Sequence, residues 1–272
     1  MEQEALGRIW ASLARLPMLE TKYFAMATGV ASHDGARSRR VGSDIVGERA
    51  YQIASAHVAS ALDHLSLMRS VMIAGQLPPY SLFSLARTAY ESAVQALWLM
   101  DPDLDDDQQL ARAVGAQFAE YNEREKAEND MGLQPAPGSH TAAQRRATYM
   151  TNAVAKGLTK LAANGDVVPL EAIPATYDLF HKYGTVSHVD GNGNDVTVSG
   201  GTKYRLFSAF AHGKQWANML ITMQPTETLP VGGVLAHVEA SDELLVIAYS
   251  EPVDVLERAL DGYCIHAELA TQ

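Results

Sequence analysis

An amphipathic repeat within residues 44–75 constrains the fold of this chain more than any other feature of its sequence. Its apolar residues recur at alternating steps of four and three positions, which places them on one face of an α-helix. The residues of this seam are Ala54, Val58, Ala61, Leu65, Met68 and Met72. A long helix with one apolar face must pack against other elements. Gly75 and the Pro78-Pro79 pair end it, because proline cannot continue a helix.

A second long helix is predicted over residues 81–100, with Ser81 as its N-terminal cap. The short connection between the two helices favours antiparallel neighbours. One apolar strip of this helix is supplemented by a second strip beside it, formed by Phe83, Val94 and Trp98. A helix with such a wide apolar surface is expected in the middle of a helical bundle.

Further helices are predicted over residues 105–130, 141–163, 173–183 and 202–216, with one or two more within residues 2–30, broken near Pro17. Five aspartates lie between Asp101 and Asp107, where carboxylates favour the dipole of the helix that follows and need no metal. After a small β hairpin near residues 219–239, Ser241 is expected to cap a return to helix. Pro252 would start or kink the last helix.

The sequence therefore predicts a mainly α fold, a multi-helix bundle with a small β hairpin near residues 219–239. All of residues 1–272 are expected to form a single mainly helical domain. Within it, residues 1–43 would form an N-terminal helical arm and loop, residues 44–216 the core of the bundle, and residues 217–272 the hairpin and the C-terminal helices.

Charge and composition limit the classes of function. The 272-residue chain carries 21 Lys and Arg against 32 Asp and Glu, and its net charge of −11 repels polyanions at long range. A broad nucleic-acid-binding surface is therefore not expected. A local basic site that could bind RNA remains open, because four basic residues fall within twelve positions, namely Lys203, Arg205, His212 and Lys214.

Cysteine usage and hydropathy indicate the compartment. The single cysteine, Cys264, excludes an intramolecular disulfide, and the start of the chain lacks the basic and apolar pattern of a secretion leader. No apolar run approaches the ~20 residues that span a bilayer. The sequence favours a cytoplasmic protein that does not enter a membrane.

Three polar residues of the predicted 202–216 helix are spaced so that they share one strip. Ser208 follows Arg205 by three positions and precedes His212 by four. A guanidinium can hold a phosphate by two parallel hydrogen bonds, and a histidine can transfer a proton near neutral pH. These residues could cleave a phosphodiester without a metal. Alternatively, Arg205 pairs with a buried carboxylate, and His212 links neighbouring helices.

Arg87 and Glu91, four residues apart on the predicted 81–100 helix, are expected to form a partly buried ion pair. Such a pair either orders the bundle or orients a nearby site. If the site is real, Glu91 is the first candidate for a residue that contacts and orients Arg205 or His212 without contacting the substrate.

No metal or cofactor is expected. His57 and His64 lie seven residues apart, which does not match the adjacent-turn ligands of a helical zinc site. Glu120 and Glu123 lack a matching histidine. The glycine-rich segment 190–195 lacks the lysine and the serine or threonine of a phosphate-binding loop, and no dinucleotide, zinc-helix or nucleophile-elbow motif is present.

The Arg205–His212 pair, with six residues between its members, resembles the R-x(4–6)-H signature of the HEPN superfamily. The segment from Leu85 to Ala93, together with Ser208 to Gly213, also resembles uncharacterised bacterial helical proteins related to that group. HEPN proteins are helical bundles, often homodimers, and many are metal-independent ribonucleases of defence or toxin systems. The resemblance implies that Arg205 holds the scissile phosphate and that His212 assists proton transfer, in a site often shared across the dimer.

Two functions therefore remain. The first is a HEPN-like, metal-independent ribonuclease with Arg205, His212 and Ser208 at its site and with Arg87 and Glu91 behind it. The second is a non-catalytic helical module that binds a small molecule or a protein partner. The two differ in whether Arg205 and His212 are accessible to solvent or buried within one chain.

Overall fold

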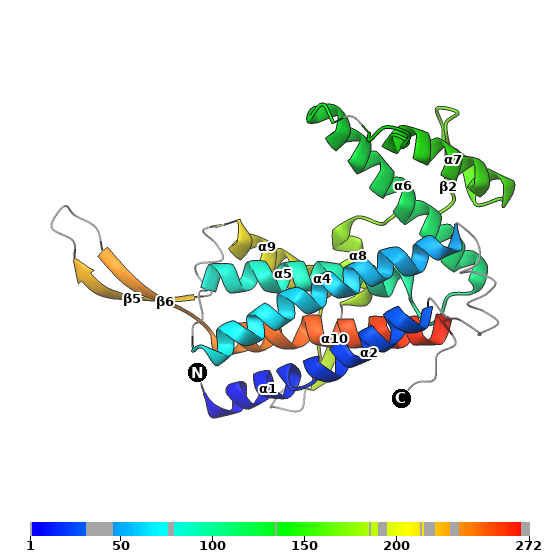
Figure 1. Cartoon of the computed structure of the whole chain (residues 1–272). Coiled ribbons are helices and arrows are strands. Elements are labelled where there is room, and N and C mark those ends of the chain that lie inside the picture. The colour runs from blue at the N-terminus through cyan, green and yellow to red at the C-terminus, as the bar shows by residue number, and fades with distance from the viewer. Residues whose placement is uncertain are drawn as a thin grey trace. The chain divides into compact units, whose positions relative to one another are not determined.

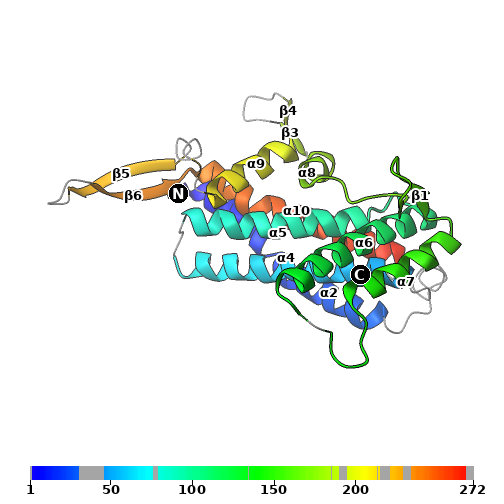
Figure 2. The same cartoon turned by 90° about the horizontal axis from the view of Figure 1, so that it is seen from above.

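The computed structural model of the chain is mainly helical, with small antiparallel strand pairs, as the sequence predicts (Figures 1 and 2). The residues that it describes are 2–30, 46–75, 79–133, 135–184, 186–189, 195–212, 214, 221–228 and 234–267. Its helices are α1 (Gln3–Leu13), α2 (Leu16–Val30), α4 (Gly47–Ile73), α5 (Pro79–Leu99), α6 (Asp106–Asp130), α7 (Ala142–Ala155), α8 (Thr176–Tyr183), α9 (Gly200–Ala211) and α10 (Asp242–His266). Its strands are β1 (Thr159–Leu161), β2 (Val167–Pro169), β3 (Val186–Val189), β4 (Asp195–Val198), β5 (Ile221–Thr228) and β6 (Val234–Ala240).

Contacts divide the chain into two compact units. The first unit consists of residues 1–24, 57–98 and 176–260, and the second of residues 25–56, 99–175 and 261–272. Four helices contribute residues to both units, namely α2, α4, α10 and, with its last residue, α5. The predicted subdivision into an arm, a bundle core and a C-terminal part stays a prediction.

The helix that the apolar repeat predicts is present as α4. All six residues of the seam, from Ala54 to Met72, are at most 7% exposed. The helix ends at Ile73, and Gly75 follows with a φ of +68°, a conformation that glycine adopts without strain. In the first unit α4 lies beside α5, where the hydroxyls of Ser60 and Ser92 are 3.1 Å apart.

The start of the second long helix differs from the prediction. Helix α5 begins at Pro79, so Ser81 lies inside its first turn and is not the residue before it. Proline is well suited to this first position, because its fixed φ fits the helix and its missing N–H has no partner there in any case. The wide apolar surface is confirmed, since Phe83, Val94 and Trp98 are all buried.

The predicted 141–163 helix is too long. Thr141 caps α7 through the backbone N–H of Gln144, but the helix ends at Ala155 and Gly157 then adopts a φ of +71°. The following residues form the β1–β2 hairpin, in which Leu161 pairs with Val167. Asn164 and Gly165, which the sequence places at a helix end, form the turn of this hairpin, because strand pairing competes with helix formation once Gly157 has turned the chain.

Several other predicted elements are confirmed, with adjusted limits. The break in the N-terminal region falls at residues 14–15, so Pro17 is the second residue of α2. Asp105 caps α6 in a reciprocal arrangement with Gln108, which accounts for the acidic start of this helix. The predicted 202–216 helix ends at Ala211 in α9. Residues 213, 215 and 216 lie outside the described part of the chain.

The strand pairs beyond α8 were predicted only in part. The expected hairpin is confirmed as β5 and β6, which pair antiparallel from Ile221–Ala240 to Thr228–Val234 with an irregularity after Pro225. The β3–β4 pair flanks the glycine-rich segment and was not predicted. Of that segment, residues 190–194 lie outside the described residues. Ser241 caps α10 as expected, whereas Pro252 lies inside this one helix and starts no new one.

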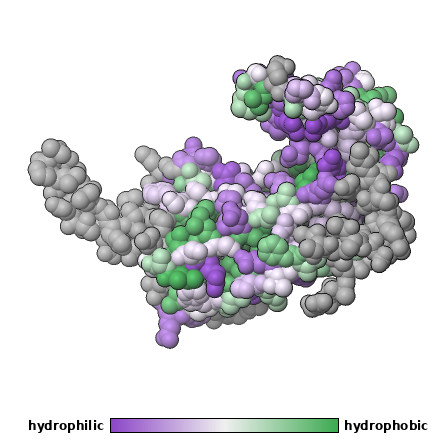
Figure 3. All heavy atoms as spheres, viewed as in Figure 1, coloured by the Kyte–Doolittle hydropathy of each residue, from purple (hydrophilic) through white to green (hydrophobic). Residues whose placement is uncertain are grey.

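The second unit has its own apolar core. A buried cluster joins α6, α7 and the start of β1, and its members are Val46, Ala111, Val114, Tyr149, Ala153 and Leu158. The α6–α7 region of Figure 3 is coloured largely as hydrophilic, in keeping with the many charged residues of the second half of α6.

A glycine provides a test of close packing in the second unit. A Cβ atom at Gly262 would lie 1.8 Å from the carbonyl oxygen of Met100, so Gly262→Ala must displace backbone. We expect a loss of about 1–3 kcal/mol in the free energy of unfolding, measured by urea denaturation. The matched control is Gly7→Ala in α1, where a Cβ meets nothing within 4 Å. That change should instead stabilise by about 0.5–1 kcal/mol, because alanine favours the helix. Equal effects of the two changes would contradict the close approach.

His57 on α4 predicts a pH dependence of stability. Burial lowers the pKa of His57 to about 4, whereas an unfolded histidine titrates near its ordinary pKa of about 6.5. Between these values only the unfolded chain binds the proton, so the free energy of unfolding is fully present above about pH 6.5 and falls as the pH drops toward 4. We expect a loss on the order of 2 kcal/mol between pH 7 and pH 5, measured by urea denaturation.

The His57→Gln variant should lack this part of the pH dependence, because glutamine does not titrate. His64→Gln on the same helix is the control and should keep the wild-type dependence. An unchanged pH dependence in His57→Gln would show that His57 is not the responsible group.

Candidate functional site

The candidate site lies in the first unit, where α9 packs on α5 and α8. Two glycines at the start of α9 allow the close approach to α8. A Cβ atom at Gly200 would lie 1.9 Å from the carbonyl oxygen of Phe180, and one at Gly201 would lie 2.5 Å from the ring of Tyr177. On the α5 side, the rings of Phe83 and Phe210 stack with centroids 4.2 Å apart. These backbone and ring contacts set the position of α9 against α5 and α8.

Lys203 is not part of a basic surface, in contrast to its predicted grouping with Arg205, His212 and Lys214. Its side chain is 4% exposed, and its ammonium group lies 2.6 Å from the carboxylate of Glu251 on α10. The same ammonium group donates to the carbonyl of Gly184 at 3.4 Å. The local basic site therefore consists of Arg205, His212 and Lys214, which are all exposed.

Arg87 on α5 forms the centre of the polar cluster. Its Nε donates to Glu91 at 2.8 Å, which confirms the predicted ion pair, and the two side chains are 21% and 25% exposed. Its Nη1 lies 2.9 Å from Nε2 of His212, and its Nη2 donates to the hydroxyl of Tyr204 at 3.4 Å. The guanidinium also lies over the Tyr204 ring, 5.4 Å from the centroid. Three residues thus hold the guanidinium of Arg87 from three directions.

The Arg87–His212 contact, if it is a hydrogen bond, constrains the tautomer of the histidine. A guanidinium has only donors, so Nε2 of His212 must accept, and an imidazole that accepts at Nε2 is neutral and carries its proton on Nδ1. Arg87 itself stays charged, because the hydrogen bond and the charge of Glu91, with help from Tyr204, outweigh partial burial and raise the pKa of Arg87. His212 is thus exposed to solvent beside the guanidinium of Arg87.

Arg205 lies in a different environment although it belongs to α9, the helix that His212 directly follows. Its guanidinium is over the ring of Tyr177 on α8, 4.6 Å from the centroid. The Tyr177 ring stacks with His181, whose Nδ1 is 2.9 Å from the hydroxyl of Ser199. The structure therefore brings Arg87 to His212, and it directs Arg205 to α8.

The remaining predicted residues have supporting positions. Ser208 is half-buried, and its carbonyl accepts the backbone N–H of His212 at 3.0 Å, just past the end of α9. Glu91 does not contact Arg205 or His212 in any described interaction, but it is connected to His212 through Arg87. Sequence reasoning missed Tyr204 and Tyr177, whose roles depend on contacts between helices; only the proximity of Tyr204 to Arg205 in the sequence could have indicated it.

Both Arg205 and His212 are exposed, so neither is buried within the chain. Each also contacts a neighbouring helix, His212 through Arg87 on α5 and Arg205 through Tyr177 on α8. The catalytic and the structural interpretations of this pair therefore both stay open.

The described residues offer neither a metal site nor a membrane-spanning helix. No three or more His, Cys, Asp or Glu side chains of that part of the chain are arranged to hold a metal ion. His64 uses Nδ1 to contact the carbonyl of Ser60 at 2.8 Å, and Glu123 pairs with Lys126 at 2.6 Å. Among the helices that the structure describes, none has the length and apolar character needed to cross a membrane.

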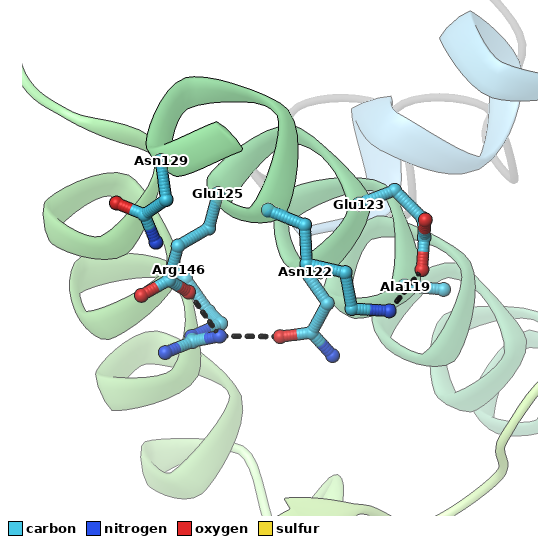
Figure 4. A pocket seen from close by; sticks show the side chains of 7 residues that line it. Ala119, Asn122, Glu123, Glu125, Asn129 and Arg146 are labelled. Carbon is cyan, nitrogen blue, oxygen red and sulfur yellow. Dashed lines mark hydrogen bonds and ion pairs between the residues drawn. The ribbon is translucent and has the colours of Figure 1, made fainter. Parts of the chain in front are cut away.

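A pocket on the α6–α7 hairpin of the second unit is unsuited to a charged ligand (Figure 4). Its cations are already paired. Arg146 contacts Glu125 at 2.5 Å and also donates to the side-chain oxygen of Asn122, and Lys126 pairs with Glu123. A charged ligand would have to displace these internal partners.

Comparison with known proteins finds no matching family, no matching curated protein and no matching solved structure. The geometry of the site is therefore the main indication of function.

The Arg87–His212 contact predicts which tautomer of His212 is populated. In wild-type protein near pH 8, ¹⁵N NMR of the imidazole should show an unprotonated Nε2 and a protonated Nδ1, because Arg87 occupies the Nε2 lone pair. Arg87→Met should remove this preference. Arg205→Met is the control and should leave the His212 spectrum unchanged. A protonated Nε2 in the wild-type protein would show that the contact does not persist in solution.

Proposed function

We propose that this protein is a HEPN-like, metal-independent ribonuclease whose site includes His212, Arg87, Glu91, Arg205 and Ser208. The observation that carries the proposal is the exposed His212, whose Nε2 lies 2.9 Å from a guanidinium that Glu91 orients. A neutral imidazole can accept a proton, and a guanidinium can neutralise a phosphate, which are the two tasks of metal-free phosphodiester cleavage.

The proposed reaction uses the ribose as the internal nucleophile. Nε2 of His212 takes the proton of the 2′-hydroxyl, and the 2′ oxygen forms a bond to phosphorus. The bond from phosphorus to the 5′ oxygen breaks, and that oxygen takes a proton from solvent. The products are a 2′,3′-cyclic phosphate and a 5′-hydroxyl. The reaction requires the 2′-hydroxyl, so DNA is not a substrate.

In this proposal Arg87 contacts both His212 and the substrate, whereas the sequence predicted that it lies behind the site. Without substrate, its Nη1 occupies the Nε2 lone pair of His212. A bound phosphate offers the guanidinium a stronger, charged acceptor. Transfer of Arg87 to the phosphate would free Nε2 to act as the base. Arg205, which is exposed on α9, is then available for a neighbouring phosphate or, as the resemblance implies, for the scissile one.

The wider setting of the proposal comes from the resemblance to HEPN proteins. It includes a homodimer with a shared site, a cytoplasmic location and a role in a defence or toxin system. A small exposed basic site fits a chain of net charge −11 better than a broad RNA-coating surface does.

The direct test is cleavage of a panel of single-stranded and structured RNAs in the presence of EDTA. We expect cleavage that leaves 2′,3′-cyclic phosphate ends, and none of DNA of the same sequence. His212→Ala and Arg87→Ala should each lower the rate by about 10²-fold or more, because proton transfer and charge stabilisation are lost. Arg205→Ala reports whether the second arginine is also required.

The matched control is His64→Ala, a histidine of the same unit that lies outside this cluster. It should keep the wild-type rate, and circular dichroism should show that all variants are folded. If RNA is not cleaved by the wild-type protein, or if His212→Ala cleaves it at the wild-type rate, the proposed function is wrong.

A further inference from the structure

A second pocket of the second unit has a different electrostatic character from the one in Figure 4. It has a volume of about 270 Å³ and is lined by residues from the start of α4, from α6 and from α7. Among the described residues, its lining contains two arginines, Arg49 and Arg145, and no carboxylate. The net charge of the chain is −11, so a cavity whose described lining holds two cations and no acid is unusual in it. Such a cavity is suited to an anionic ligand.

One face of α7 supplies much of the lining. Arg145, Thr148 and Asn152 follow one another at steps of three and four, so they project from the same side of this helix. Tyr121 of α6 forms another wall and packs edge-on against Tyr149, with ring centroids 6.0 Å apart. Arg49 adds the second guanidinium from α4. The site is thus built on helices that share the apolar core of this unit.

The two arginines are held by neutral groups. Arg49 donates from Nη1 to the side-chain oxygen of Gln52, and Arg145 donates from Nε to the carbonyl of His140 at 3.2 Å. Over the described residues, neither forms an ion pair. Each guanidinium is therefore oriented, yet it keeps donors that its neutral partners do not use.

Two other arginines of the same helices form ion pairs with carboxylates, in contrast to Arg49 and Arg145. Arg146, next to Arg145 in sequence, pairs with Glu125 at 2.5 Å, and Arg124 pairs with Glu128 at 2.9 Å. The Glu128 carboxylate also accepts the backbone N–H of Ala142, which with Arg124 and the more distant charge of Arg145 holds the pKa of Glu128 below its usual value. Glu128 is thus already engaged by other donors.

Most other polar groups of the pocket are also engaged internally. The hydroxyl of Thr148 donates to the carbonyl of Gln144 at 3.1 Å, and that of Tyr149 donates to the carbonyl of Val46 at 3.3 Å. The described groups left to meet a ligand are the two guanidinium groups, the exposed imidazole of His140, the Asn152 amide and the half-buried ring of Tyr121. Two guanidinium groups can bind a phosphate through paired hydrogen bonds, and the ring can contact a flat, apolar part of the ligand.

We propose that this pocket binds a small phosphorylated molecule, no larger than a mononucleotide, through Arg49 and Arg145. A cavity of about 270 Å³ is near the lower end of the usual range for small-molecule sites. This size fits one phosphate and one ring and is too small for a run of nucleic-acid backbone. The inference is independent of the ribonuclease proposal, because no residue of the Arg87–His212 cluster lines this pocket.

The experiment is a calorimetric titration of the full chain with AMP, pyrophosphate and adenosine at low salt. We expect AMP and pyrophosphate to bind and adenosine not to bind, because the two arginines recognise the phosphate. Arg145→Gln and Arg49→Gln should each weaken the binding of AMP about 10-fold or more, since each removes charge-assisted hydrogen bonds.

Arg146→Gln is the matched control, because it removes the same charge from the adjacent residue, which already pairs with Glu125. It should change the affinity for AMP less than twofold, and thermal unfolding should verify that each variant is folded. His212→Ala should bind AMP as the wild type does, which separates this site from the proposed ribonuclease site.

Two results would overturn the proposal. One is the absence of AMP and pyrophosphate binding, or an equal loss of binding in Arg145→Gln and Arg146→Gln, which would indicate nonspecific attraction. The other is binding of a short single-stranded RNA that Arg145→Gln abolishes while AMP does not bind, which would assign the pocket to nucleic acid instead of a small molecule.

Discussion

The buried ion pair between Lys203 and Glu251 is the interaction on which the candidate site depends. Its two side chains are 4% and 12% exposed and lie 2.6 Å apart, so each charge needs the other. The carbonyl of Gly184 accepts from Lys203 and also from the hydroxyl of Tyr90 at 3.1 Å. Burial, with a contribution from Glu251, raises the pKa of Tyr90, so this hydroxyl stays protonated and donates. One polar cluster thereby joins α5, the end of α8, α9 and α10.

The exposed chemistry lies directly beside this buried framework. Tyr204 follows Lys203 in sequence, and Arg87 precedes Tyr90 by three positions, so residues that face inward fix their neighbours that face outward. The stacked rings of Phe83 and Phe210 hold the end of α9, where His212 emerges. These buried contacts between α5 and α9 keep the Arg87–His212 distance short.

The sequence predicted the helices well where local periodicity and caps determine them. The seam from Ala54 to Met72, the cap at Asp105 and the cap at Ser241 each depend on residues within a few positions of one another. Predictions failed where a distant or competing contact decided the outcome. Residues 159–161 pair with residues 167–169 in a hairpin instead of extending α7. Lys203 is buried because its ammonium group pairs with Glu251.

The sequence by itself determined the mainly helical fold and the Arg87–Glu91 pair, because both follow from spacings of three and four residues along a helix. It also placed Arg205 on a helix, although that helix ends one residue before His212. Only the tertiary structure decided that His212 meets Arg87 and that Arg205 meets Tyr177. It also decided that Arg49 and Arg145 share a pocket without a carboxylate. These pairings join residues far apart in the chain, and they are set by how the helices pack, which no local pattern records.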